Sequence, residues 1–150
     1  MRTAGLEDVD AIVSLRERLW PGSPEGEHET EVRAILDGTP RSTLPLTLIV
    51  AEVEGEVVGV VEVGLRSHAD GCDPSRPVGF VEGWYILPRH RRKGIGSALI
   101  SSAESWSREQ GCTELASDTR IENDESQRAH EALGFEVVDR CVNYRKGLGS

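Results

Sequence analysis

Arg91-Arg92-Lys93-Gly94-Ile95-Gly96 separates an apolar run that ends at Pro88 from an amphipathic segment that ends at Gly111. A strand, a short basic loop and a helix in this order present unpaired backbone N–H groups at the start of the helix, where the aligned peptide dipoles are partly positive. Glycine lacks a Cβ atom, so an anion can approach the backbone closely, and basic side chains beside it add charge. The stretch therefore indicates a phosphate-binding turn.

Taken alone, this hexapeptide has two interpretations. It does not follow the pattern G-x-G-x-x-G, because Leu99 stands at the third glycine position, and it is not a Walker loop, because no G-K-[ST] follows. It is either a phosphate-binding turn or a glycine-softened turn between a strand and a helix, with solvated basic residues. Features elsewhere in the chain are needed to distinguish the phosphate-binding turn from the plain structural turn.

The composition predicts one globular domain, which we place at residues 1–148. A chain of 150 residues with 37% hydrophobic content can bury a sizeable single core. The net charge of -9 argues against nucleic acid or an anionic membrane as the main partner and suits a cationic ligand. No apolar run approaches the roughly 20 residues of a membrane helix, and the first residues lack the apolar core of a signal peptide.

The cysteines and histidines suggest neither a disulfide framework nor a metal site. Cys72, Cys112 and Cys141 are widely spaced and odd in number, without a C-x-x-C pair, and the four histidines lack metal-ligand spacing. We therefore expect a reduced, cytoplasmic protein that needs no metal. Trp106, Cys112 and Cys141 are expected in the core.

Hydrophobic periodicity and turn residues predict a mixed α/β domain in the order βααβββαβαβ. Trp20-Pro21-Gly22 ends the first helix, Glu54-Gly55-Glu56 forms a hairpin turn, and Asn123 or Asp124 caps the last helix. The helices are expected at residues 6–19, 28–36, 95–110 and 125–133. The strands are expected at residues 2–4, 46–53, 57–65, 78–87 and 113–117, with a closing strand or hairpin at 135–145.

This order, together with Arg91-x-x-Gly94-x-Gly96 after a strand and Leu133-Gly134-Phe135 near the end, resembles the GNAT superfamily of acetyl-CoA-dependent N-acetyltransferases. The resemblance covers essentially the whole chain. It implies the GNAT acyl-CoA N-acyltransferase fold, with a central, mostly antiparallel sheet, a splayed strand pair and about four flanking helices. It also implies acetyl-CoA as co-substrate.

A narrower resemblance is to the dimeric branch of the aminoglycoside 6'-N-acetyltransferases. It implies acetyl transfer to the 6'-amine of a polycationic aminoglycoside, antibiotic resistance and a homodimer. The segments that carry it are Leu19-Trp20-Pro21-Gly22, Asp70-Gly71-Cys72-Asp73, Phe80-Val81-Glu82-Gly83, Ala116-Ser117-Asp118-Thr119, Glu122-Asn123, Ala132-Leu133-Gly134-Phe135-Glu136 and Tyr144-Arg145-Lys146.

The resemblance assigns the acetyl-CoA site to the strand and turn around residues 84–97. Backbone groups of the strand pair with the pantetheine arm, and the N–H of Ile86 polarises the thioester carbonyl. Asn123 reaches the pantetheine, caps its helix, or does both. We expect the side chain of Arg91 to pair with acidic groups or face solvent, and those of Trp84 and Tyr85 to be ordinary core or surface aromatics. The implied cofactor-binding residues are Trp84, Tyr85, Ile86, Arg92, Lys93, Gly94, Ile95, Gly96, Ser97 and Asn123.

The resemblance also implies a carboxylate-lined substrate site. Glu82, Asp118 and Asp139 match positions that bind the aminoglycoside, Trp20 matches a residue that packs against the sugar, and His68 falls where relatives have tyrosine. A carboxylate accepts the hydrogen bonds that an ammonium donates. Glu82 is the first candidate for the base that removes the amine proton and Asp118 the second, with water as the alternative for both.

The proton donor to the CoA thiolate stays open between His130 and Tyr144. Many relatives have tyrosine four residues before the Gly-Phe pair, where this chain has His130. Histidine can donate a proton near neutral pH, whereas Tyr144 matches a tyrosine of the resembling enzymes. No cysteine has a visible histidine partner, so direct transfer is expected. The alternative functions are a GNAT enzyme acting on a polyamine or peptide N-terminus, and a non-catalytic acyl-CoA-binding module.

Overall fold

The computed structural model describes residues 1–149, which divide into two compact units, Met1–Asp118 and a unit that begins at Thr119. The second unit contains one helix, α4 (Asp124–Ala132), within the described residues. The elements of the first unit are β1 (Arg2–Thr3), the 3₁₀ helix η1 (Leu6–Asp8), α1 (Val9–Leu19), α2 (Glu27–Leu36), β2 (Leu46–Val53), β3 (Glu56–Arg66), β4 (Val78–Ile86), the 3₁₀ helix η2 (Pro88–His90), α3 (Ile95–Glu109) and β5 (Leu115–Ser117).

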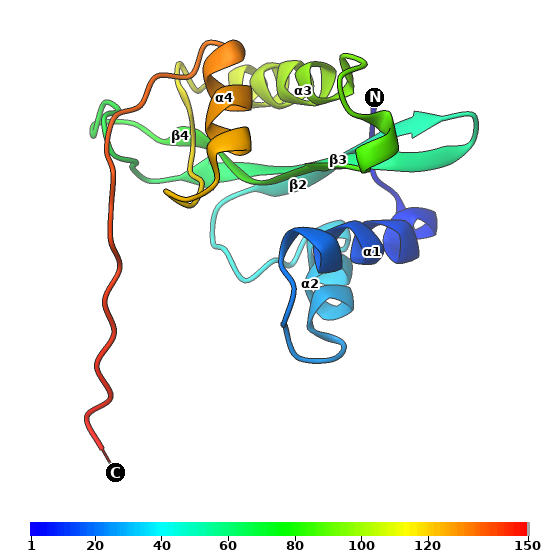
Figure 1. Ribbon diagram of the computed structural model, residues 1–150, viewed down its shortest axis with the longest axis horizontal. Helices are drawn as coiled ribbons and strands as arrows, with labels where there is room; N and C mark the ends of the chain where they lie inside the picture. The colour runs from blue at the N-terminus through cyan, green and yellow to red at the C-terminus, as the bar shows by residue number, and fades with distance from the viewer. Residues whose placement is uncertain (150) are drawn as a thin grey trace. The chain divides into compact units, whose positions relative to one another are not determined.

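Among the described residues, five strands form one sheet in the order β1-β2-β3-β4-β5 (Figure 1). The first four are antiparallel to their neighbours, and β4 is parallel to β5. The parallel pairing covers only Gly79, Phe80 and Val81 of β4. Beyond Val81, β4 has no strand on that side within residues 1–149. The expected mostly antiparallel sheet with a splayed strand pair is therefore confirmed.

Helices cover both faces of the sheet. In Figure 1, α1 and α2 lie on one face and α3 lies on the other. This explains why residues 58–64 of β3 are buried without alternation, since a strand covered on both sides has no solvent face. On α3, Leu99 and Ala103 are completely buried, and they belong to the apolar stripe that the sequence predicts.

The predicted hairpin turn joins β2 to β3. Val53 pairs with Glu56, which leaves Glu54 and Gly55 as a two-residue loop. Both loop residues have positive φ, 51° and 80°. This is the backbone of a type I' turn, which matches the right-handed twist of the flanking strands.

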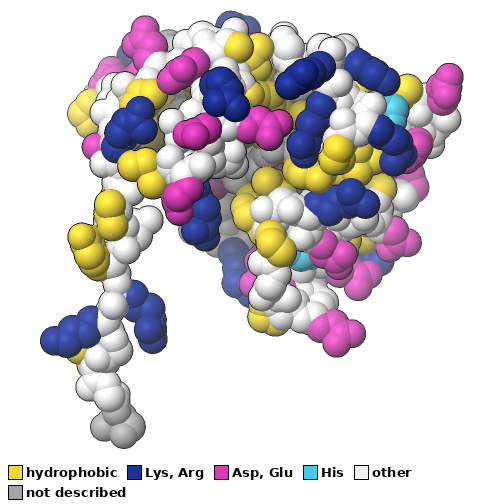
Figure 2. All heavy atoms as spheres, viewed as in Figure 1, with side chains coloured by type: hydrophobic (Ala, Val, Ile, Leu, Met, Phe, Trp, Pro, Cys, Tyr) yellow, Lys and Arg dark blue, Asp and Glu magenta, His cyan; other side chains and the backbone are white. Residues whose placement is uncertain are grey.

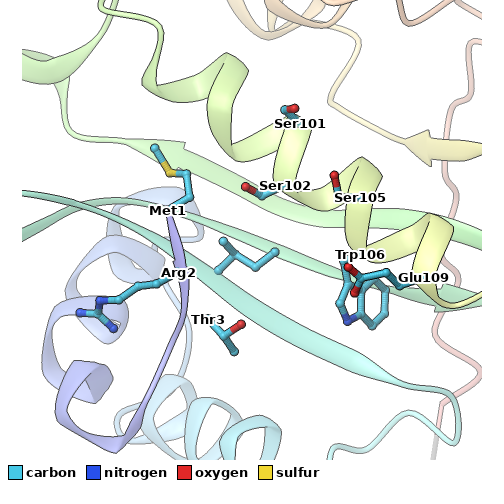
Figure 3. A pocket seen from close by; sticks show the side chains of 9 residues that line it. Met1, Arg2, Thr3, Ser101, Ser102, Ser105, Trp106 and Glu109 are labelled. Carbon is cyan, nitrogen blue, oxygen red and sulfur yellow. The ribbon is translucent and has the colours of Figure 1, made fainter.

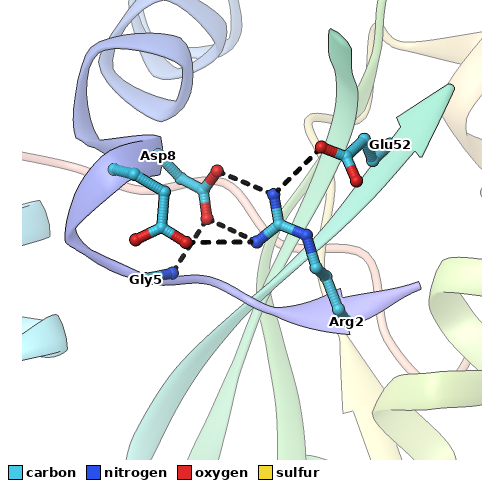
Figure 4. Close-up of polar contacts among 5 residues, drawn as sticks. Arg2, Gly5, Asp8 and Glu52 are labelled. Carbon is cyan, nitrogen blue, oxygen red and sulfur yellow. Dashed lines mark hydrogen bonds and ion pairs between the residues drawn. The ribbon is translucent and has the colours of Figure 1, made fainter. Parts of the chain in front are cut away.

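The N-terminus is fixed by a buried carboxylate (Figure 4). Asp8 is only 4% exposed and accepts two hydrogen bonds from Arg2, at 2.7 and 2.9 Å, and one from the Gly5 N–H at 2.8 Å. These donors, Arg2 foremost, hold the pKa of Asp8 below its ordinary value. Arg2 also contacts the exposed Glu52 at 3.4 Å. The short strand β1 is thereby tied to η1 and β2.

Two expectations for the core and the C-terminal segment are wrong. Residues 135–149 contain no strand, and Val138 and Val142 in this segment are 62% and 65% exposed. Their β-branched side chains suggest a strand, but a strand forms only where a neighbour pairs with its backbone. Cys141 is likewise exposed rather than in the core.

The other two predicted core residues differ in their burial. Cys112 is buried, as expected, and burial raises the pKa of its thiol. Trp106 is only half-buried. No helix within residues 1–149 combines the length and apolar character needed to cross a bilayer.

Candidate active site

A β-bulge sets the position of Glu82. Glu62 of β3 pairs with Gly83, and Val63 pairs with Val81, so Glu82 is an extra residue of β4 without a partner on β3. A bulge bends its strand and redirects the side chain of the extra residue. The pairing of β4 with β5 ends at Val81, one residue before the bulge. Glu82 therefore lies where the open edge of β4 begins.

The open edge of β4 includes the backbone of Ile86. The N–H of Leu87 donates to Val58 O on β3 at 2.9 Å. Backbone groups of successive strand residues point to opposite sides, so the N–H of Ile86 points away from β3, toward the open edge. The Ile86 N–H is therefore directed to the side of β4 that carries no further strand beyond Val81 among residues 1–149.

The side chain of Arg91 lies against the end of β4. Its Nε donates to Ile86 O at 2.9 Å, and its guanidinium carbon lies 5.2 Å from the centroid of the Tyr85 ring. The Arg91 side chain is exposed, one of the two expected alternatives, and the Ile86 carbonyl at the open edge accepts one of its hydrogen bonds. Arg91 thus covers the last carbonyl of β4.

The turn between β4 and α3 has the properties of an anion site. Arg92 and Gly94 have positive φ, 61° and 82°, and α3 begins directly afterwards at Ile95. Arg92, Lys93, Gly94 and Ser97 are exposed, and Figure 2 shows Lys and Arg side chains gathered over this part of the first unit. An exposed helix N-terminus with adjacent cations fits a diphosphate.

Glycine occupies positions 94 and 96 for two different physical reasons. Gly94 needs its positive φ, and nothing lies within 4 Å of a Cβ built there. At Gly96 a Cβ would lie 3.1 Å from Trp84 Cζ2 and 3.3 Å from Ile86 Cδ1. Gly96 is therefore explained by close packing against β4, which the sequence did not reveal, and the half-buried Trp84 supports the first turn of α3.

Two of the predicted carboxylates lie around one arginine. The Arg66 Nε and Nη2 atoms donate to Glu82 at 2.8 and 2.7 Å, and the Arg66 guanidinium carbon lies 3.6 Å from the centroid of the Phe80 ring. Glu82 and, less strongly, Asp118 raise the pKa of Arg66. The structure thus brings Glu82 and Asp118 into one electrostatic environment, and Arg66 is a member of the site that sequence reasoning missed.

Trp20 lies beside this pair. Its half-buried indole is in contact with Gly83, since a Cβ there would lie 2.6 Å from Trp20 Cη2. Trp20 also lines a hollow of about 400 Å³ at the α1–α2 connection, together with Glu17, Glu25 and Glu29. His68 is exposed in the loop after β3, with its Nδ1 3.1 Å from Ser67 Oγ.

Sequence reasoning also missed a buried ionic cluster behind Trp20. Arg16 and Glu62 form an ion pair with a 2.7 Å hydrogen bond. Burial raises the pKa of Glu62 to about 7, against the lowering effect of Arg16. The available signal was the position of Glu62, a single carboxylate in the middle of an apolar strand.

The remaining predicted residues belong to the unit that begins at Thr119. Asn123 caps α4, since its Oδ1 accepts a 3.0 Å hydrogen bond from the Ser126 N–H. The His130 Nδ1 lies 2.7 Å from Ser126 O, and its ring makes an edge contact with Phe135 at 5.1 Å between centroids. A carbonyl oxygen only accepts, so Nδ1 carries the proton in this bond. Asp139 and Tyr144 are exposed in the segment after α4, Tyr144 by 92%.

Another cavity does not involve the predicted site. It measures about 280 Å³ and lies between β1, Ile49 of β2 and α3 (Figure 3). Ser101, Ser102, Ser105 and the half-buried Trp106 line it from α3. No predicted catalytic, cofactor-binding or substrate-binding residue is among its lining residues. Within residues 1–149, no group of three or more His, Cys, Asp or Glu side chains is arranged to hold a metal ion.

Comparison with known proteins agrees with this geometry. Residues 11–135 match the profile of the acetyltransferase (GNAT) family. The aminoglycoside N(6')-acetyltransferase type 1 of Serratia marcescens is 46% identical over 145 residues, which cover 95% of each chain. The enzyme of the same name from Klebsiella aerogenes is 39% identical over 148 residues, which cover 99% of this chain and 96% of the relative.

A solved structure gives the same result. AAC(6')-Iy in complex with the bisubstrate analog CoA-S-monomethyl-acetylneamine superposes with a TM-score of 0.87 at 36% identity, covering 97% of this chain and 96% of the other. The match extends over the turn at Gly94 and over both compact units. The chain therefore belongs to the acetyltransferase (GNAT) family, in the branch formed by the aminoglycoside N(6')-acetyltransferases.

Proposed function

We propose that this chain transfers the acetyl group of acetyl-CoA to the 6'-amino group of aminoglycosides and thereby gives resistance to them. The observation that carries the proposal is the arrangement of β4, where a bulged carboxylate, Glu82, is followed by an open edge that leads to the turn at Gly94. The names of the relatives and the bisubstrate complex of AAC(6')-Iy support the same pair of substrates.

The residues around the turn fit acetyl-CoA. Arg92, Lys93 and the backbone N–H groups of residues 94–97 bind the diphosphate, with Ser97 and Ile95 in the first turn of α3. The open edge at Trp84, Tyr85 and Ile86 accepts the pantetheine arm as an added strand. The Ile86 N–H donates to the thioester oxygen as negative charge develops on it. Asn123 contributes from the cap of α4.

The carboxylates bind the cationic amino sugar. Glu82, Asp118 and Asp139 accept hydrogen bonds from its ammonium groups, Trp20 packs against a ring, and His68 adds a polar contact. The incoming ammonium competes with Arg66 for Glu82, because both are cations that need the same oxygens. The negative net charge of -9 favours the approach of a polycation.

The reaction is a direct transfer. The target ammonium gives a proton to Glu82, or to Asp118 or water, and the neutral amine then attacks the thioester carbon. The new C–N bond forms, the nitrogen releases a second proton to water, the C–S bond breaks, and the sulfur leaves as a thiolate that takes up a proton. No covalent intermediate on the protein is formed.

Two groups of this chain remain candidates for that last proton. Because the His130 Nδ1 donates to Ser126 O, only the imidazolium form of His130 can give a proton from Nε2. The Tyr144 hydroxyl is the other group that can donate a proton. Comparison of His130→Gln and Tyr144→Phe separates the two, since only loss of the true donor lowers kcat.

The proposal extends to the organisation of the protein. Residues 1–148 form one acetyltransferase domain, and the family match over 11–135 supports this because it spans the boundary at Asp118. The protein acts in the cytoplasm as a homodimer, as the resemblance to the dimeric branch implies, and uses no metal.

The test is a set of two measurements. CoA release is followed with kanamycin or tobramycin and compared with spermidine and with peptides that have a free N-terminus. A susceptibility panel then contrasts 6'-amino with 6'-hydroxyl aminoglycosides in cells that express the chain. Protection against the 6'-amino compounds alone is expected. Turnover of spermidine or peptides alone would favour a different amine, and tight acetyl-CoA binding without any transfer would favour a binding module.

A further inference from the structure

Four polar side chains from three elements meet beneath Trp20. We call them the Arg16 cluster: Arg16 of α1, His28 and Glu31 of α2, and Glu62 of β3. Arg16, His28 and Glu62 are only 5%, 7% and 9% exposed. Charged and polar groups are costly to bury unless each has a partner, so such a cluster has to be closely connected.

The hydrogen bonds of the cluster lead from the sheet to the backbone of Trp20. Arg16 Nη1 donates to Glu62 at 2.7 Å, Nη2 donates to Glu31, and Nε donates to His28 Nδ1 at 3.3 Å. Because Arg16 is only a donor, His28 Nδ1 accepts, and the ring proton lies on Nε2. Nε2 then donates to Trp20 O at 3.2 Å.

Two of these residues, His28 and Arg16, also contact the indole ring of Trp20. The rings of Trp20 and His28 are stacked, with 6.5 Å between centroids and 20° between planes. The Arg16 guanidinium carbon lies 5.0 Å from the centroid of the Trp20 ring. An arginine over an indole is attracted to its negative face. Trp20 is therefore held at two places, at its backbone carbonyl and at its indole ring.

Gly83 supports the far edge of the ring. A Cβ at Gly83 would lie 2.6 Å from Trp20 Cη2 and 3.0 Å from Cζ2, closer than two such atoms approach each other. Gly83 does not have a positive φ, so backbone conformation does not require a glycine there. What requires it is foremost the indole, which comes closest, and then Leu19, whose Cδ2 would lie 3.1 Å from the same Cβ. Gly83 pairs with Glu62 across the strands and directly follows Glu82.

We infer that His28 and Arg16 are positioning residues that hold the Trp20 indole over Gly83, and that this fixes one wall of the amine pocket beside Glu82. The inference deepens the proposed function and rests on it for the identity of the ligand, an amino sugar that packs against Trp20. A fixed indole binds a sugar ring without first losing conformational freedom. A loosened indole weakens sugar binding and leaves the turn at Gly94 unchanged.

The first test compares two substitutions of His28. His28→Leu keeps a side chain of similar volume but removes both hydrogen bonds, whereas His28→Gln keeps one acceptor for Arg16 and one donor for Trp20 O. We expect His28→Leu to raise the KM for tobramycin about 10-fold, with the KM for acetyl-CoA and the far-UV circular dichroism unchanged. His28→Gln is expected to stay within about 2-fold of the parent protein. Equal effects of the two variants, or an equal rise in both KM values, would overturn the inference.

The second test approaches the indole from the other side. Gly83→Ala introduces the Cβ that meets Trp20 and is expected to raise the KM for tobramycin about 10-fold. Trp20→Phe removes the atoms Cη2 and Cζ2 that the Cβ would meet. In that background Gly83→Ala is therefore expected to change the KM for tobramycin by less than about 2-fold. The two substitutions are then non-additive, as is usual for residues in contact. Additive effects of the two substitutions would contradict the inference, and this holds even if His28→Leu does not fold.

A third measurement does not depend on the ligand. In a Trp84→Phe/Trp106→Phe background, Trp20 is the one remaining tryptophan, since the chain has three. His28→Leu should shift its emission to longer wavelength and lower its anisotropy, and His28→Gln should not. If the parent protein acetylated no aminoglycoside but this difference held, the proposed function would fail and the positioning of Trp20 would stand. An unchanged emission in both variants would overturn the positioning itself.

Discussion

Glu82 and Arg66 form a two-bond ion pair across the end of the sheet, with Arg66 Nε 2.8 Å from Oε2 and Nη2 2.7 Å from Oε1 of Glu82. The guanidinium is also stacked on Phe80. The carboxylate that the resemblance assigns to the substrate therefore already has a cation beside it. This relationship determines what substitution of Arg66 should do.

Arg66→Gln is expected to lower the KM for tobramycin about 5-fold, because a substrate ammonium no longer competes with a guanidinium for Glu82. The size of the effect follows from the ion pair that is lost, since a half-exposed pair contributes about 1 kcal/mol. Steady-state kinetics at two salt concentrations measure the effect. The matched control is Arg108→Gln on α3, which makes the same charge change where the side chain is 70% exposed. A KM that rises in Arg66→Gln would mean that Arg66 orients Glu82 instead of competing for it.

Gly94→Ala is expected to raise the KM for acetyl-CoA about 10-fold, because a Cβ disfavours the positive φ that aligns the first N–H groups of α3. The cost in stability is about 1 kcal/mol. Gly55→Ala is a matched control, since Gly55 has φ of 80° against 82° for Gly94 and nothing lies within 4 Å of its Cβ position either. It should lose the same stability and keep its KM. Isothermal titration with CoA provides the binding readout, and equal affinities in both variants would exclude the turn as the diphosphate site.

Glu62 should make the protein less stable as pH rises toward neutrality. Burial raises the pKa of Glu62 from 4.5 to about 7, so the folded state binds more protons than the unfolded state between these values. The contribution is present below pH 4.5 and is lost as pH rises to about 7. Glu31 on the same guanidinium keeps Arg16 paired while Glu62 is protonated.

Glu62→Gln removes this titration but keeps an acceptor for Arg16. The parent protein should therefore lose roughly 3 kcal/mol of unfolding free energy relative to the variant between pH 5 and pH 8. The variant is thus favoured at the higher pH. Urea unfolding at several pH values measures it. A constant difference over this range would show that Glu62 titrates normally.

Asp8→Asn is expected to destabilise the first unit by about 2 kcal/mol at pH 7, because the buried acceptor of Arg2 and the Gly5 N–H loses its charge. The pKa of Asp8 is lowered, so its stabilisation is present above its unfolded pKa and is lost as pH falls through the folded value. The penalty should therefore shrink at low pH. Glu52→Gln removes another partner of Arg2; the Glu52 side chain is 43% exposed, so this change should alter stability by less than about 0.5 kcal/mol.

The elements that the sequence predicts well are those with local causes. The helix expected at 95–110 is α3 at Ile95–Glu109, and the last helix begins after the Asn123 cap, because apolar spacing and capping residues act within a few positions of each other. The hairpin at Glu54-Gly55 has the same local basis. The strand expected at 135–145 had suitable side chains but lacks a pairing partner among the described residues.

The predicted site also contains features with local causes and features that depend on residues far apart in the chain. The turn at Gly94 is recognisable in the sequence because its residues follow one another in the chain, whereas Glu82 was implied by the resemblance that Phe80-Val81-Glu82-Gly83 carries. The bulge at Glu82, the pairing with Arg66 and the contact of Gly96 with Trp84 depend on strand register and on how α3 docks, which no short segment encodes.

The sequence by itself determined the order of the elements as far as α4, the basic turn with its glycines before α3 and the negative charge that suits a polycation. Only the tertiary structure decided which charges meet, because Arg16, His28 and Glu62 come from three elements separated by up to 46 positions. Burial in the folded state is what forces these groups to pair with one another, and the same burial holds Trp20 over Gly83.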